Sequence, residues 1–250
     1  MIDLANETAL ITGASRGIGA EIAKTFGMCG CKVAVNYLQN ERAAEKTISA
    51  VEEVGGKALA FQADVREEEQ VNRMVESVST KLGQPTILIN NASSPIISKK
   101  LGKTDWSEFI LCFETAIKSA FNCASAISPL MRKQRRGKII NIISQYVFNV
   151  PPIAMATYIT SKHALVGFSK SLAVELAPFG VQVNMISPGL TETDLTSHLS
   201  ETIIQASAQS TLMKRNAQTS DTASTALYLV SDLSNHLTGV NIPVCGGNVM

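Results

Sequence analysis

The sequence predicts one α/β domain of the dinucleotide-binding kind, and three observations support this prediction. Short apolar runs alternate with longer amphipathic stretches along nearly the whole chain, as in folds built from strand–helix units. A glycine-rich segment, Thr12–Gly19, separates the first apolar run from the first helical pattern. No linker rich in glycine, serine or proline interrupts the alternation, so we expect a single domain over residues 1–250.

Apolar runs predict the strands, and apolar residues at helical spacing predict the helices. We expect strands at Thr8–Ile11, Cys31–Asn36, Ala58–Phe61, Thr86–Ile89, Ile139–Ile143, Val181–Ile186 and in the tail Thr238–Gly247. We expect helices from Ile18, at Glu41–Val54, at Glu67–Leu82, at about Asp105–Ser128, around Tyr158 and Lys162, and at about Thr219–Ser231. Pro129 is expected to stop the helix before it, because proline has no N–H to donate.

The segment Leu190–Gln218 differs from the rest of the chain. It is polar, with no clear strand and only a weak helical pattern. Long irregular segments in compact enzymes are frequently lids. We therefore expect a mobile substrate lid here, and we expect the loop Ser94–Thr104 to shape the same pocket.

The composition excludes several classes of partner. A net charge of +1 leaves no global field that would attract nucleic acid or anionic lipid. No apolar run approaches the ~20 residues that span a bilayer. The segment Met1–Glu7 lacks the basic and apolar regions of a signal peptide. We expect a cytoplasmic protein without a membrane segment.

The five cysteines and three histidines do not predict a metal site. Cys29 and Cys31 are too close for a CxxC redox motif, and the other cysteines and the histidines are scattered. Buried, reduced thiols in a cytoplasmic protein are the expected interpretation.

Tyr158 and Lys162 are four residues apart, so they lie one turn apart on the same face of a helix. A free tyrosine has a pKa near ~10, and a neighbouring cation is expected to lower the pKa of the phenol toward the working range. Ser144, fourteen residues upstream, is placed to hold a carbonyl oxygen against the phenol. These residue types predict ketone reduction or alcohol oxidation, given a hydride carrier. The alternatives are a tyrosine at the core edge with a solvated lysine, and a serine that caps a turn.

The glycine-rich segment predicts the site for that carrier. Its glycines allow the backbone to approach a pyrophosphate, and the following helix offers free N–H groups and a positive dipole end. The residues expected to contact a cofactor here are Gly13, Ser15, Arg16, Gly17, Ile18 and Gly19. The alternative is a tight strand-to-helix turn without a ligand.

The end of the second strand indicates which dinucleotide is bound. Sites for NAD usually carry an acid there to bind the ribose, whereas this chain has Asn36. No carboxylate would repel a 2′-phosphate, and Arg16 is available to pair with it. We therefore expect NADPH/NADP+ as the cofactor.

Polar residues follow two further strands. Asp64 could accept a hydrogen bond from an adenine amino group, although a turn aspartate is the alternative. Small residues after the fourth strand would leave room for a ribose. Asn90 and Asn91 could also tie strands together, and for Asn90 that interpretation is favoured.

Taken together, these segments resemble the short-chain dehydrogenase/reductase family, over nearly the full length of the chain. The sequence looks most like the 3-oxoacyl-[acyl-carrier-protein] reductase branch or a tailoring reductase derived from it. The matching pieces are Thr12–Gly19, Asp64-Val65, Asn90-Asn91-Ala92, Ser144, Tyr158-x-x-x-Lys162, Pro188-Gly189 and Gly246-Gly247.

The resemblance implies a single-domain Rossmann fold with a doubly wound, seven-stranded parallel sheet, and a homotetramer. It implies Tyr158 as proton donor, Ser144 as the carbonyl-orienting hydroxyl, and Lys162 as the group that lowers the tyrosine pKa and binds the nicotinamide ribose. It places the remaining cofactor contacts at Asp64, Val65, Asn91, Ala92, Ile186, Pro188, Gly189, Thr191 and Thr193.

Four positions depart from the family pattern. Ala116 stands where a helix asparagine usually helps to hold a proton-relay water, and Ser93 stands where glycine is usual. The spacing between Ser144 and Tyr158 is one residue longer than the commonest pattern. Phe179 replaces an arginine that carrier-binding relatives often have, which weakens a housekeeping role in fatty-acid synthesis.

The basic run around Arg135 and Arg136 is either a solvated turn or a docking patch for an acidic acyl carrier protein. The expected activity is NADPH-dependent reduction of a ketone, a 3-oxoacyl thioester or a related polyketide- or fatty-acid-like carbonyl. One alternative is an NADP-binding regulatory or scaffold protein with little turnover. Another is a dehydrogenase for a non-acyl alcohol or ketone.

Overall fold

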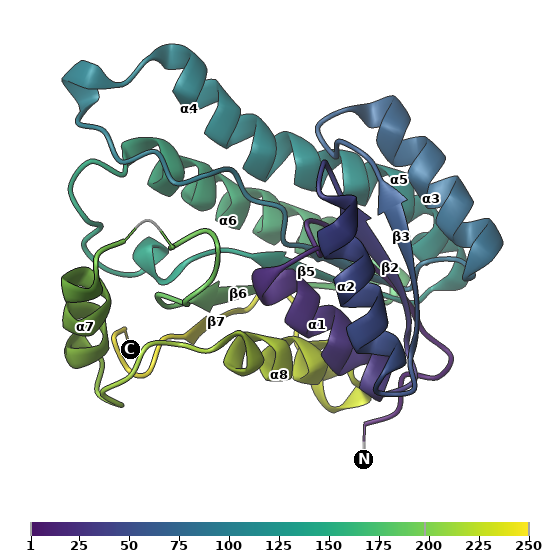
Figure 1. Ribbon diagram of the computed structural model, residues 1–250. Helices are drawn as coiled ribbons and strands as arrows, with labels where there is room; N and C mark the ends of the chain where they lie inside the picture. The colour runs from purple at the N-terminus through teal and green to yellow at the C-terminus, as the bar shows by residue number, and fades with distance from the viewer. Residues whose placement is uncertain (1, 198, 250) are drawn as a thin grey trace.

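The computed structural model describes residues 2–197 and 199–249. A seven-stranded sheet with the order β3-β2-β1-β4-β5-β6-β7 forms its centre, and every neighbouring pair is parallel (Figure 1). The strands are β1 Thr8–Ile11, β2 Lys32–Tyr37, β3 Lys57–Gln62, β4 Ile87–Asn90, β5 Gly137–Ile142, β6 Val181–Pro188 and β7 Asn241–Val244. The expected doubly wound α/β fold is confirmed.

Helices cover both faces of the sheet, with α1, α2 and α8 on one face and α3, α5 and α6 on the other (Figure 1). The α-helices are α1 Gly17–Met28, α2 Glu41–Glu52, α3 Glu68–Lys81, α4 Trp106–Phe113, α5 Ser119–Gln134, α6 Ala156–Leu176, α7 Glu201–Ser210 and α8 Thr219–Val230. A π-helical turn, Glu114–Lys118, joins α4 to α5. Short 3-10 helices lie at Leu101–Lys103, Gln145–Val147, Ala177–Phe179 and Asp232–Ser234.

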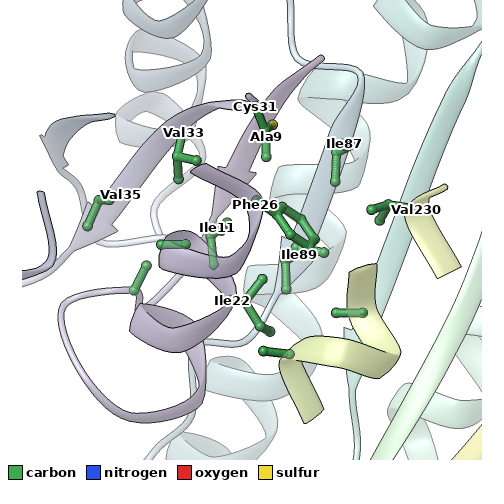
Figure 2. Packing of buried hydrophobic residues seen from close by; sticks show 14 of the residues in the cluster. Ala9, Ile11, Ile22, Phe26, Cys31, Val33, Val35, Ile87, Ile89 and Val230 are labelled. Atoms are coloured by element: carbon green, nitrogen blue, oxygen red, sulfur yellow. The ribbon is translucent and has the colours of Figure 1, made fainter. Parts of the chain in front are cut away.

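The first strand shows how the two layers of core arise. Alternate side chains of a strand point to opposite faces of its sheet. Ile11 packs with Ile22 and Phe26 of α1, and Val230 of α8 belongs to the same cluster (Figure 2). Leu10 belongs to the cluster on the other face. Both faces are covered, so this inner strand is fully buried and largely apolar.

The prediction that Pro129 ends its helix is wrong. Pro129 lies inside α5, which continues to Gln134. The ring removes a hydrogen bond to the carbonyl of Ser125, and both residues lie on the exposed face, where water can replace the missing donor. The opposite face buries Ile127 and Met131 in the core, which offsets the local cost.

The helical stretch Trp106–Gln134 is long and apolar enough to cross a membrane by length and composition alone, with a mean hydropathy of 1.2 in its most apolar window. This is weak evidence, because core helices of globular domains pass the same test. Its apolar residues are spread along a helix rather than gathered in one continuous run, and it packs against α3 and α6.

The lid segment is more regular than its sequence indicates. It contains the helix α7, and an isolated parallel bridge pairs Thr191 with Ala217. The α7 helix has no fully buried residue, which explains why its apolar periodicity is weak.

We expect Pro129→Ala to stabilise the protein by about 1–3 kcal/mol, because it restores an exposed helix hydrogen bond and removes a steric clash. Urea denaturation should show a higher midpoint with an unchanged slope. Ser128→Ala, on the neighbouring position of the same helix, is the matched control and should change stability much less. An unchanged or lower midpoint for Pro129→Ala would contradict this account of the helix.

Candidate active site

The predicted site residues gather at the carboxyl edge of the sheet. The glycine turn follows β1, Asn91 follows β4 and Ser144 follows β5, while Pro188 ends β6. Ligands of parallel α/β sheets bind at this edge, outside the carboxyl ends of the strands. The fold therefore brings together segments from all along the chain.

The glycine turn has a conformation that larger residues would not adopt easily. Gly13 and Gly17 both have a φ of 60°, in the left-handed region. A Cβ on Gly13 would lie 2.9 Å from the Cα of Ala92. A Cβ on Gly19 would lie 2.5 Å from the side-chain nitrogen of Asn91 and 2.8 Å from the carbonyl oxygen of Gly13. The turn thus needs glycine for its own backbone and for its neighbours.

The N-terminus of α1 follows this turn directly. Arg16 is its N-cap, and within the described residues its side chain makes no capping hydrogen bond. Free N–H groups at a helix N-terminus bind phosphate. Half-buried Ser15 and Ile18 flank Arg16 and the first helical turn. The close-packed glycines and the uncapped helix start fit the pyrophosphate of a nicotinamide dinucleotide.

Asn91 holds the glycine turn to the end of β4. Its side-chain nitrogen donates to the carbonyl oxygens of Thr12, at 2.9 Å, and Gly13, at 3.0 Å. The hydroxyl of Thr12 accepts from the backbone N–H groups of Asn91 and Ala92, both at 3.0 Å. The favoured structural interpretation of Asn90 fits as well, since its amide donates to Asn141 of β5 at 2.7 Å.

Asn36 lies differently from its predicted place at the ribose. Its side chain is buried and donates to the carbonyls of Phe61, at 3.3 Å, and Ala63, at 3.1 Å. Its side-chain oxygen accepts from the N–H of Gly13 at 3.2 Å. The amide therefore ties β2 to β3 and to the glycine turn, because a buried polar group needs partners.

Asp64 is already paired with a neighbour. Its carboxylate accepts from the guanidinium of Arg66, with a shortest contact of 2.6 Å, and from the backbone N–H of Arg66 at 3.0 Å. The Arg66 hydrogen bond holds the pKa of Asp64 below its usual range. The carbonyl of buried Val65 accepts from Asn122 at 3.1 Å. The turn-aspartate alternative therefore describes the observed contacts of Asp64.

Ser144, Tyr158 and Lys162 come together in a buried cluster. All three are buried, with 6%, 8% and 4% of their surface exposed. The Lys162 ammonium lies 5.6 Å from the centre of the Tyr158 ring and donates to the carbonyl of Ile142 at 2.9 Å. Ser144 begins a 3-10 helix, where its hydroxyl accepts from the N–H of Tyr146 at 3.4 Å.

The direction of the tyrosine pKa shift corrects the sequence expectation. Burial raises the pKa of Tyr158 to about 12, and the nearby Ser144 hydroxyl only partly opposes this. Burial lowers the pKa of Lys162 to about 8. At neutral pH the phenol is therefore protonated and the ammonium charged. A protonated phenol is the form that donates a proton to a developing alkoxide.

Two residues that sequence reasoning missed lie near Tyr158. Tyr146 and Cys112 both help to raise the pKa of Tyr158. The Cys112 sulfur also accepts from the hydroxyl of Ser94 at 3.5 Å. Tyr146 lies two residues after Ser144, and this position in the sequence could have indicated that it lies near Tyr158.

Ala116 lies in the π-helical turn, buried beside α6. The turn is closed by a hydrogen bond from the N–H of Ser119 to the carbonyl of Glu114, five residues earlier. Such turns are frequent at functional sites. The π-helical turn thus forms with an alanine at position 116, where the family pattern would place an asparagine.

The segment after β6 packs on β7 and reaches the glycine turn at Thr193. The N–H of Gly189 donates to the carbonyl of Val244 at 2.9 Å, and the hydroxyl of Thr191 donates to Gly189 at 3.1 Å. The Thr193 methyl group would lie 3.4 Å from a Cβ on Gly17. Of the predicted contacts at Pro188, Gly189, Thr191 and Thr193, Thr193 therefore lies beside the glycine turn.

Arg135 and Arg136 lie at the opposite edge of the sheet, between α5 and the start of β5. Arg136 forms an ion pair with Glu7, and Arg135 donates to the carbonyl of Pro178 at 2.9 Å. The full length of β5, about 20 Å, separates them from Ser144. In one protomer the basic pair and the buried cluster face different ends of the sheet.

No group of three or more His, Cys, Asp or Glu side chains is placed to hold a metal ion in residues 2–197 and 199–249.

Residues 13–248 match the family described as Enoyl-(Acyl carrier protein) reductase. The 3-oxoacyl-[acyl-carrier-protein] reductase of Staphylococcus epidermidis is 34% identical over 247 residues, which cover 98% of this chain and 100% of the relative. The chain belongs to the short-chain dehydrogenase/reductase family. It is an oxidoreductase, and its cofactor is a nicotinamide dinucleotide.

Solved structures of family members have the same architecture. The structure of 7α-hydroxysteroid dehydrogenase complexed with NADH and 7-oxo glycochenodeoxycholic acid superimposes with a TM-score of 0.93 and 33% identity, covering 99% of this chain and 96% of that one. A 3-oxoacyl-[acyl-carrier protein] reductase with bound NAD from Brucella melitensis has a TM-score of 0.90 and 28% identity, covering 100% and 94%.

Gly19→Ala should weaken both cofactor binding and the fold, because the new methyl group meets Asn91 and the backbone of Gly13. We expect a loss of about 1–3 kcal/mol in stability and weaker binding of NADPH in fluorescence titration. Gly167→Ala on α6 is the control, because nothing lies within 4 Å of its Cβ position. It should stabilise the helix by about 1 kcal/mol. Equal behaviour of the two variants would refute the close packing of the turn.

Lys162→Met should raise stability at pH 7, because the folded chain buries a charge that the unfolded chain leaves in water. A pKa that falls from 10.5 to about 8 corresponds to about 3 kcal/mol. The folded state binds fewer protons between these two values, so the stability of the parent protein rises with pH there. The advantage of the variant should be full below pH 8 and vanish as the pH approaches 10.5. Denaturation at pH 7 and 10 would measure it, and an advantage that is independent of pH would contradict the assignment.

Proposed function

We propose that this oxidoreductase reduces the ketone of a 3-oxoacyl thioester, or of a related polyketide- or fatty-acid-like substrate, with NADPH. The proposal rests chiefly on one observation: Ser144, Tyr158 and Lys162 form a buried cluster at the sheet edge that also carries the glycine turn. Binding of a dinucleotide alone would not need these three side chains together.

The chemistry divides between cofactor and protein. A bound nicotinamide supplies the hydride, and the protein supplies alignment and electrostatic stabilisation. The hydroxyls of Ser144 and Tyr158 bind the substrate oxygen. As negative charge develops on that oxygen, both hydrogen bonds strengthen, and Tyr158 transfers its proton.

Lys162 stabilises the negative charge that forms on Tyr158 as the proton leaves. Its charge stabilises the tyrosinate that remains, and the carbonyl of Ile142 fixes the position of the ammonium. Because the cluster is buried, this attraction is less screened than it would be in water. The proton is then restored to Tyr158 from solvent, through backbone groups or water near the π-helical turn that contains Ala116.

The preference for NADPH is supported by two features. Strand β2 ends in Asn36 and Tyr37, with no carboxylate to repel a 2′-phosphate. Arg16 offers an exposed guanidinium on the glycine turn. The two structural relatives were solved with NADH and with NAD, so NADH is the cofactor against which NADPH must be compared.

The substrate class is supported by the names of the sequence relatives, which act on acyl-carrier-protein substrates. The steroid dehydrogenase supports the second candidate, a dehydrogenase for a non-acyl alcohol or ketone. Its coverage and TM-score are as high as those of the 3-oxoacyl-[acyl-carrier protein] reductase structure. A scaffold protein with little turnover remains the alternative that Ala116 favours.

Carrier docking and assembly depend on each other in this proposal. A carrier held by Arg135 and Arg136 sits at the amino edge, about 20 Å from the cluster of its own protomer. It would therefore deliver its substrate to another copy.

Exposed apolar side chains along α4 and α5, including Trp106, Phe113 and Phe121, support the proposed homotetramer. We also propose a single domain with a lid at residues 190–218, and a cytoplasmic location, since all five cysteines are free.

The proposed activity is tested by the loss of NADPH absorbance with acetoacetyl thioesters, both carrier-bound and coenzyme-A-bound, beside a panel of free ketones including steroids. Tyr158→Phe should lower turnover by at least about a hundredfold, because it removes the proton donor. It should leave NADPH affinity nearly unchanged.

Tight NADPH binding without turnover on any ketone would favour the scaffold alternative. Turnover that survives Tyr158→Phe would refute the assignment of the proton donor. A clear preference for NADH over NADPH in the same assay would refute the cofactor assignment.

A further inference from the structure

An ion pair joins the glycine turn to the lid. The guanidinium of Arg16 lies 2.9 Å from the carboxylate of Asp194, although 178 residues separate them in the sequence. Both side chains are largely exposed. The same stretch of lid brings Thr193 within 3.4 Å of the Cβ position of Gly17. The first part of the lid is thus held directly over the phosphate-binding turn.

Arg16 also stands next to the end of β2. The N–H of Ala14 donates to the carbonyl of Asn36 at 2.9 Å, and the N–H of Gly13 donates to its side chain at 3.2 Å. The turn that carries Arg16 is therefore fixed between the lid and the strand end where the adenosine ribose binds in this type of fold. Its guanidinium has an anionic partner on the lid side, which it contacts through Nη1.

A guanidinium uses its planar fork for one anion at a time when it makes paired hydrogen bonds. A phosphate monoester carries more charge than a carboxylate and has more acceptor oxygens. A phosphate that takes both N–H groups of the guanidinium edge that includes Nη1 would displace the carboxylate of Asp194.

We propose that Asp194 competes with the 2′-phosphate of NADPH for Arg16, and so limits the discrimination between NADPH and NADH. When the phosphate takes the guanidinium, the first part of the lid loses its tie to the glycine turn. The inference rests on the proposed function only in requiring that a dinucleotide binds at this turn. Asp194 is a specificity residue that acts through Arg16 and touches no reacting atom.

The expected effect is modest, because exposed ion pairs contribute little. Removing the competing carboxylate should tighten NADPH binding by two- to fivefold, where fivefold corresponds to about 1 kcal/mol. NADH has no 2′-phosphate, so its affinity should not change. Raising the salt concentration should reduce the difference, because the pair is exposed.

The test measures the dissociation constants of NADPH and NADH by fluorescence for the parent chain, Asp194→Asn, Arg16→Gln and the double variant. Asp194→Asn should tighten NADPH alone, and Arg16→Gln should weaken NADPH alone. In the Arg16→Gln background, Asp194→Asn should have no effect, because its partner is gone. Glu192→Gln is the matched control, since it removes an exposed acid from the same segment, two residues away.

Hydrogen exchange gives a second readout that does not depend on turnover. Adenosine 2′,5′-bisphosphate should speed exchange of the backbone amides of residues 191–197, as Asp194→Asn should, whereas adenosine 5′-monophosphate should not.

Three outcomes distinguish a failure of the proposed function from a failure of the inference about Asp194. A failure of the parent chain to bind either dinucleotide would overturn the proposed function and this inference together. Binding of NADPH that Asp194→Asn and Glu192→Gln change equally would overturn the inference alone. Equal tightening of NADPH and NADH by Asp194→Asn would do the same, because it would show a general effect of the lid.

Discussion

The candidate cofactor site depends on hydrogen bonds between the backbone of the glycine turn and two side-chain amides, buried Asn36 and half-buried Asn91. Asn91 donates to the carbonyls of Thr12 and Gly13, and Asn36 accepts from the N–H of Gly13. These bonds hold the ends of β1, β2 and β4 in one arrangement. They also require that Gly19 carries no side chain, because its neighbour Asn91 fills that space. The position of the α1 N-terminus follows from this packing.

The chemical half of the site is built on a buried charge that the core does not neutralise. Lys162 donates to a neutral carbonyl, and within the described residues it pairs with no carboxylate. Burying an unpaired ammonium costs stability, which a purely structural lysine would avoid by reaching solvent. The same burial keeps Tyr158 protonated and strengthens its interaction with the ammonium once the phenol has lost its proton. Stability and reactivity are opposed at this one side chain.

The elements of the sheet and the shared face of Tyr158 and Lys162 could be predicted from the sequence, because buried parallel strands are continuous apolar runs and residues four apart lie on one helical face. That this cluster is catalytic stays a prediction. Other features depend on surroundings that one sequence does not display. Pro129 stays inside a helix because the carbonyl of Ser125, which loses its N–H partner, lies on the exposed face and can bind water. Asn36 turns inward because β3 and the glycine turn offer it partners. The pKa of Tyr158 rises because the depth of burial, which the sequence does not reveal, outweighs the opposing effect of Ser144.

The π-helical turn Glu114–Lys118 also changes how the long helical stretch can be interpreted. One extra residue in a turn rotates all later side chains by about 100° relative to a regular α-helix. The apolar stripe of α4 therefore does not continue as the stripe of α5. Both segments contact α6, and α5 also contacts α3. A one-residue deletion here would restore a regular helix, yet it would turn the aromatic face of α4 away from its present direction. The distortion thus determines how the aromatic face of α4 is oriented relative to α5.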